Sequence, residues 1–69
     1  MIWHPKAGQI VRVNYKDKAM PYQGYSGIIR AVGKRIKNCL VEIQGNRHCV
    51  VIPRGNLNAD KLQNMQTSH

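Results

Sequence analysis

Apolar and polar residues alternate with a period of two near the start of the chain. Within residues 8–16, Val11, Val13 and Tyr15 share one side of an extended chain, and the other side holds Arg12, Asn14 and Lys16. Because side chains point alternately to the two faces of a β-strand, this pattern predicts a half-buried strand. Residues 27–32 are rich in β-branched side chains and end at Gly33, which predicts a second strand.

A β-hairpin is predicted in the second half of the chain. Residues 39–44 and 47–52 flank Gly45 and Asn46, two residues that both tolerate a positive φ. A two-residue turn fixes the register of the two antiparallel strands. The expected pairs are Gln44 with Arg47, Ile43 with His48, Val41 with Val50 and Cys39 with Ile52.

The same register separates the two cysteines. Cys39 and Cys49 fall on opposite faces of the hairpin, so both are expected to be free thiols. The chain has no CxxC motif, and its histidines are scattered at positions 4, 48 and 69. We therefore expect no metal site and no cofactor. His48 is interpreted as a residue of the core or its rim rather than as a catalytic base.

The end of the chain differs in character from the rest. Residues 53–56 predict a single tight helical turn, after which Leu57 returns as a short fifth strand. Residues 58–69 are polar and form either one weak amphipathic turn or a disordered tail; disorder is favoured because such short helices are marginal in water. The predicted organisation is one all-β domain over 1–57 and a flexible C-terminal tail over 58–69.

The charge balance indicates a negatively charged partner. The chain has 11 Lys and Arg against 3 Asp and Glu, a formal net charge of +8 and a pI near 10.1. Nucleic acid is the first hypothesis, because neutralising phosphates releases counterions and this release drives binding of any sequence. RNA is favoured over DNA. The alternatives are an acidic protein or complex, and a charge that serves solubility alone.

Positive charges gather in two predicted loops. Residues 34–38 hold three like charges that would repel one another in a packed element, which predicts a solvated loop. Residues 17–25 contain Pro21 and Gly24 and predict a long loop with tyrosines beside lysines, a combination typical of surfaces that bind single-stranded bases. The candidate RNA-binding residues are Lys16, Lys18, Tyr22, Arg30, Lys34, Arg35, Lys37 and Arg47, with Tyr22 stacking on a base.

A local motif sharpens the predicted fold. Gly8 to Val13, followed by Gly24 to Ile29, resembles the KOW motif of ribosomal proteins and transcription elongation factors. This resemblance implies a small five-stranded barrel of the Src-homology-3 (SH3) type that binds RNA or docks on a ribosome or polymerase. In that barrel Ala31 would face inward beside Ile29, and Trp3 is expected to cover an open end.

A second group of proteins is similar in length, charge and the Gly-initiated first strand. It comprises the small basic barrel subunits of photosynthetic electron-transfer complexes, which help to dock acidic redox proteins. This resemblance implies the alternative function of a docking or scaffold subunit that binds an acidic protein or a larger complex.

Enzymatic activity is not expected. A domain of this size buries only about 60% of the surface of its unfolded chain, too little to wall a deep cleft for a small-molecule substrate. The three carboxylates, Asp17, Glu42 and Asp60, lie far apart in the predicted elements, so we assign no catalytic residue.

The sequence contains no apolar run that could span a bilayer and no signal-peptide core. We therefore expect a cytoplasmic location without membrane insertion.

Overall fold

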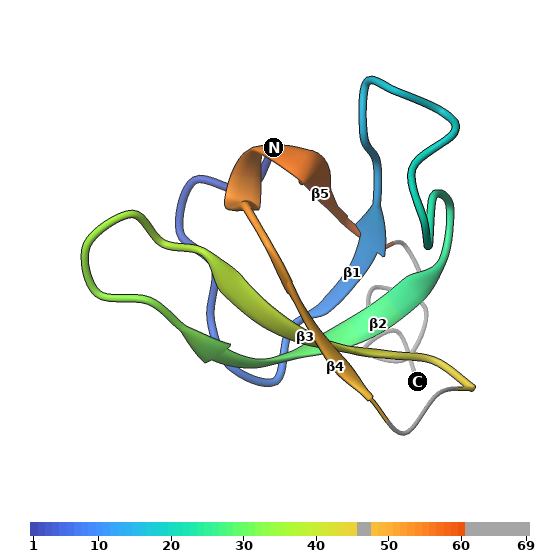
Figure 1. Ribbon diagram of the computed structural model, residues 1–69. Coiled ribbons are helices and arrows are strands. Elements are labelled where there is room, and N and C mark those ends of the chain that lie inside the picture. Colours follow the sequence, from blue (N-terminus) through green and yellow to red (C-terminus); the bar gives the residue numbers. More distant parts are fainter. Residues whose placement is uncertain (46–47, 61–69) are drawn as a thin grey trace.

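Five short strands build the fold in the computed structural model, which describes residues 1–45 and 48–60. The strands are β1 (Ile10–Val13), β2 (Ser26–Val32), β3 (Cys39–Ile43), β4 (Cys49–Ile52) and β5 (Leu57–Ala59), and a 3₁₀ helix, η1 (Arg54–Asn56), precedes β5. They form one antiparallel sheet in the order β4-β3-β2-β1-β5 (Figure 1). The predicted all-β class is confirmed.

A very short connection joins the two edge strands of the sheet, so the sheet curves to bring their ends near each other. Only residues 53–56 link β4 to β5, and Figure 1 shows η1 bridging the two edges. Ile52 and Leu57, on either side of this link, are both fully buried in the same core. No pairing joins β4 to β5 in the described part of the chain, so the sheet is open and the predicted closed barrel is not confirmed.

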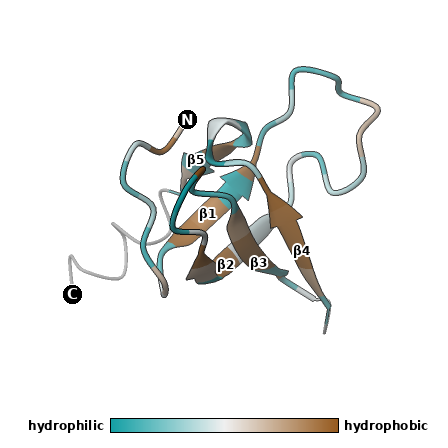
Figure 2. Cartoon of the chain, turned by 60° about the vertical axis from the view of Figure 1, so that its left-hand side comes forward, coloured by the Kyte–Doolittle hydropathy of each residue, from teal (hydrophilic) through white to brown (hydrophobic). Residues whose placement is uncertain are grey.

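The core is formed by the inward side chains of the alternating pattern. Figure 2 shows hydrophobic residues on β3 and β4 and mostly hydrophilic ones in the loops. Burying each Val or Ile of this kind contributes roughly 1.5–3 kcal/mol relative to exposure. The buried cluster comprises Ile2, Val11, Val13, Ile29, Cys39, Val41, Ile43, Ile52 and Leu57.

The hairpin of β3 and β4 has the predicted register. Cys39 pairs with Ile52 and Val41 pairs with Val50. The turn begins with Gly45 at a φ of +83°, a conformation that L residues rarely adopt. Cys39 is buried and Cys49 is exposed, and both are free thiols, as predicted. The expected partner of Gln44 lies outside the described residues.

A β-bulge in β2 reverses one predicted orientation. The register between β2 and β3 shifts between Ile29 and Ala31, so Arg30 is an extra residue. Ile29 is buried as expected, but Ala31 is exposed, and Val32 instead lies opposite the buried Cys39. The expectation that Ala31 faces inward is therefore wrong, because one inserted residue moves the following side chains to the other face.

Both ends of the predicted domain differ from expectation. Trp3 does not cover an open end: its exposed fraction is 65%, whereas Ile2 has only 8% exposed and packs in the core. At the other end β5 continues to Ala59, and Asp60 is buried, so the ordered strand passes the expected boundary at residue 57. The predicted disorder of the tail falls on residues 61–69, which lie outside the described residues.

Candidate nucleic-acid interface

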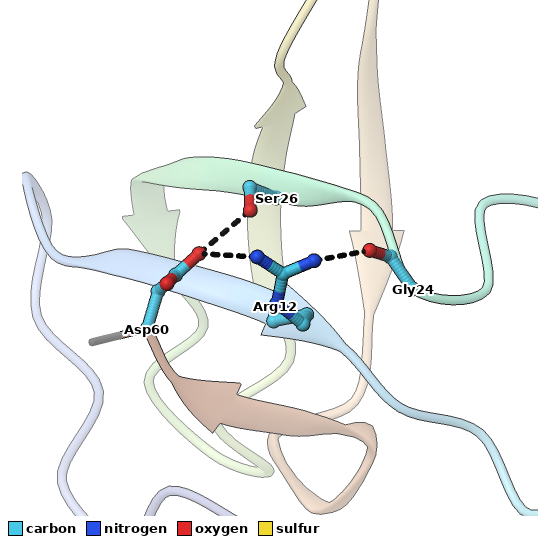
Figure 3. A network of polar contacts seen from close by, with 4 residues as sticks. All are labelled: Arg12, Gly24, Ser26 and Asp60. Carbon is cyan, nitrogen blue, oxygen red and sulfur yellow. Dashed lines mark hydrogen bonds and ion pairs between the residues drawn. The ribbon is translucent and has the colours of Figure 1, made fainter. Parts of the chain in front are cut away.

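A buried carboxylate at the end of β5 is connected by polar contacts to β1 and to the start of β2. Arg12 on β1 donates from Nη1 to the Gly24 carbonyl at 2.7 Å, and its Nη2 lies 3.4 Å from Asp60 Oδ2 (Figure 3). Ser26 Oγ donates to the same Asp60 oxygen at 2.6 Å. No local pattern predicts this network, since 48 residues separate Arg12 from Asp60 and Asp60 belongs to a polar stretch.

A second ion pair lies on the outer face of the sheet. Arg30 Nε on β2 donates to Glu42 Oε1 on β3 at 2.9 Å. This hydrogen bond and the charge of Glu42 raise the pKa of Arg30 above its ordinary value. Because Arg30 already has a carboxylate partner, it is a weaker candidate for binding phosphate than the sequence predicted.

The third carboxylate is occupied within its own loop. Asp17 Oδ1 accepts a hydrogen bond from the backbone N–H of Ala19 at 3.0 Å. All three side-chain carboxylates thus accept hydrogen bonds within the protein. Within residues 1–45 and 48–60, the cations that form no ion pair are Lys6, Lys16, Lys18, Lys34, Arg35, Lys37 and Arg54.

The predicted basic residues do not form a single cluster. The loop with Lys16 and Lys18 leads into the start of β2, and the loop with Lys34, Arg35 and Lys37 follows its end; Figure 1 shows the two loops on opposite sides of the molecule. Seven residues of β2 correspond to about 20 Å of extended chain. All five cations are exposed, and the solvated loop predicted after Gly33 is confirmed. Arg47 lies outside the described residues.

The tyrosines of the long loop differ in exposure. Tyr22, the predicted stacking residue, is partly buried and packs against the core. Its ring meets the ring of Tyr25 edge to face, with centroids 5.9 Å apart and an interplanar angle of 87°. Tyr25 is the exposed member at 52%, although the pattern had not selected it. The edge-to-face contact holds Tyr25 in a defined position.

Other candidate sites find less support in the geometry. His48 is exposed rather than packed in the core. Among the described residues there is no cluster of three His, Cys, Asp or Glu that could hold a metal ion. The described part of the chain also contains no helix with the length and apolar content needed to cross a bilayer.

Two cations outside the predicted set were missed by sequence reasoning. Lys6 and Arg54 lie outside the two predicted basic loops, which hold most of the predicted cations. The comparisons with protein-family models, curated proteins and solved structures give no match to this chain.

Proposed function

We propose that the protein binds nucleic acid, and single-stranded RNA in particular, through the exposed cations of its two basic loops. The observation that carries the proposal is the segregation of charge. Each carboxylate is engaged within the fold, whereas Lys16, Lys18 and the cations of the 34–37 loop are exposed and form no ion pair with a described residue. A polyanion that neutralises these cations gains the free energy of counterion release.

The spacing of the loops favours an extended ligand. Two cationic clusters at opposite ends of β2, about 20 Å apart along the strand, match a flexible strand of several nucleotides. The described residues offer no α-helix that could enter the major groove of a duplex. Exposed Tyr25 adds an aromatic face beside the first loop.

The arrangement of strands supports the SH3-type barrel as the finer description of the fold. A long first loop, the order β4-β3-β2-β1-β5 and a 3₁₀ turn directly before the last strand are the elements that this architecture combines. A KOW-like identity remains part of the proposal, since it agrees with binding to RNA. It is carried by Gly8 to Val13 and Gly24 to Ile29.

The test is a titration of labelled mixed-sequence RNA, followed by fluorescence anisotropy at several salt concentrations. If about four cations meet phosphates, the log–log slope of affinity against salt is about −3 for a single strand. Replacing Lys34, Arg35 and Lys37 by Gln removes up to three contacts and should flatten the slope to about −1. Absence of RNA binding at low salt contradicts the proposal.

A matched control separates charge from side-chain shape. The triple variant Lys34→Arg, Arg35→Lys and Lys37→Arg keeps three cations in the loop, so it should retain the salt slope of the parent. Because these side chains are exposed, the charge-conserving variant should keep the melting temperature of the parent, and the Gln variant should keep it or raise it slightly by relieving repulsion. A Gln variant that binds as tightly as the parent would place the interface elsewhere on the molecule.

Docking on an acidic protein is the second candidate, and one residue favours it. Ile36, between Arg35 and Lys37, has an exposed fraction of 71%. An aliphatic side chain at the centre of a basic loop suits a protein surface that can bury it within an acidic rim. A pull-down with and without nuclease distinguishes the two functions: partners that survive nuclease favour docking, and partners lost with the nucleic acid favour RNA binding.

A further inference from the structure

The segment that precedes β1 is held in place at residues 2 and 3. Ile2 packs in the core, and its backbone N–H donates to the carbonyl of Arg54 at 3.2 Å. Arg54 returns a hydrogen bond from Nη1 to the carbonyl of Trp3 at 2.7 Å. The start of the chain therefore lies against η1, as Figure 1 also shows, and the backbone of Trp3 is fixed on both sides.

The side chain of Trp3 is nevertheless exposed. Its exposed fraction of 65% is the highest among the aromatic residues of the chain. The guanidinium carbon of Arg54 lies over the ring, 5.7 Å from its centroid, within the range of a cation–π contact. The fold thus presents a large flat ring with a cation beside it and leaves most of the ring surface in water.

The segment that follows Trp3 is open to solvent and carries a cation. An open hollow of about 530 Å³ is lined by His4, Lys6, Ala7, Gly8 and Gln9, all of which lie between Trp3 and β1. Lys6 is exposed, and neither Lys6 nor Arg54 forms an ion pair with a described residue. A ligand that matches these groups has a flat face for the ring and negative charge for the cations.

We propose that Trp3 and Arg54 form a stacking platform for an unpaired nucleobase of RNA, with Arg54 and Lys6 placed for the neighbouring phosphates. This inference rests on the proposed function and adds to it a second contact surface, separate in sequence from both basic loops. A base stacked on Trp3 would cover the exposed ring. Because the backbone of Trp3 is already fixed, little conformational entropy is lost on binding. Duplex RNA, whose bases are already stacked inside, has no free base for this ring.

The chain itself contains the reporter for the test, because Trp3 is its only tryptophan. The full chain is titrated with a labelled oligouridine of about twelve nucleotides, and tryptophan emission and label anisotropy are recorded together. The expected result is quenching of Trp3 emission that follows the anisotropy curve. If anisotropy reports binding while the emission stays unchanged, the platform is overturned and the proposed function stands. If neither signal changes, both are overturned.

Two further ligands separate stacking from charge. Polyglutamate carries negative charge without bases, and a duplex RNA of the same length carries phosphates without unpaired bases. Neither should quench Trp3 by more than about one tenth of the effect of the single strand. Equal quenching by either ligand would show that the ring responds to charge alone, and this outcome overturns the platform.

Variants then measure how much the platform contributes to affinity. Trp3→Leu should weaken binding of the single strand by about tenfold or more, with the salt slope unchanged, because stacking releases no counterions. Trp3→Phe should recover part of the loss. Val51→Ala trims another exposed apolar side chain to which the proposal gives no role, so as a control it should leave the affinity unchanged. A Trp3→Leu protein with the parent's melting temperature and affinity overturns the proposal.

Discussion

At the scale of single residues, the two cysteines show how the register of one hairpin sets chemical behaviour. Cys39 is fully buried on the core face of β3, whereas Cys49 on β4 is exposed. Burial disfavours the charged thiolate and raises the pKa of Cys39 above its ordinary value of 9.0. The thiol of Cys39 also lies 3.5 Å from the carbonyl of Lys37, an acceptor that suits the protonated form.

This raised pKa predicts a loss of stability at alkaline pH. Because the folded-state pKa exceeds the unfolded one, the contribution of Cys39 is fully present below pH 9.0 and is lost as the pH rises through the folded pKa. Chemical denaturation at pH 8 and pH 10.5 should therefore show a larger fall in the free energy of unfolding for the parent than for Cys39→Ala. Cys49→Ala is the control and should behave like the parent. Equal falls in all three proteins would contradict the prediction.

At the scale of elements, the Arg12, Ser26 and Asp60 network explains why β5 continues past the predicted boundary. Asp60 is buried, and Ser26 and Arg12 supply its carboxylate with donors from β2 and β1. A buried carboxylate without such partners would be strongly unfavourable. The network therefore fixes the end of β5 to the middle of the sheet.

Removing this carboxylate should destabilise the fold more than removing an exposed one. We expect Asp60→Ala to lower the free energy of unfolding by about 1–2 kcal/mol, since charge-assisted bonds are lost and the half-exposed Arg12 regains water. Glu42→Ala breaks the exposed pair with Arg30 and should change stability little. Urea denaturation of both variants measures the difference. The prediction fails if the two variants are equally stable.

Gly27 is the second position at this scale on which the stability of the fold depends, because the neighbouring strands approach it closely. It pairs with Val11 on β1 and Ile43 on β3, and a Cβ at this position would lie 2.7 Å from the carbonyl oxygen of Glu42. Gly27→Ala should therefore lower the free energy of unfolding by about 2 kcal/mol, a cost typical of overpacking. Gly33→Ala, where the nearest atom is 3.5 Å away, is the control and should be tolerated. Thermal unfolding of both variants tests this contrast.

The hydrophobic pattern predicts the structural features that depend on residues close in sequence. It misses the features that depend on contacts between distant residues. The register of β3 and β4 follows from Gly45 and Asn46, and the strand at Val11 and Val13 follows from strict alternation. The bulge at Arg30 adds a residue that no local signal marks. For the candidate site, exposure of the 34–37 loop could be predicted from its like charges. Trp3 could not be placed, because no local signal indicates that Ile2 is the buried residue and Trp3 the exposed one.

At the scale of the whole molecule, the net positive charge lowers the stability of the fold and favours the binding of a polyanion. The net charge of +8 is spread over a small chain, and most exposed cations form no ion pair among the described residues. Their mutual repulsion is present in the folded protein and is relieved when a polyanion or salt neutralises it. The same charges should therefore produce opposite responses to salt in stability and in affinity.

We expect sodium chloride to raise the melting temperature of the protein while it weakens RNA binding. Between about 0.01 and 0.15 M salt the Debye length falls from roughly 30 Å to roughly 8 Å, which screens repulsion between the loops at the two ends of β2. The variant with Lys34, Arg35 and Lys37 replaced by Gln should gain less stability from salt, because its net charge falls from +8 to +5. Calorimetry and anisotropy on the same samples measure both responses. A parent whose melting temperature falls with salt would show that attractive ion pairs outweigh repulsion, so that the cations are not available to a ligand.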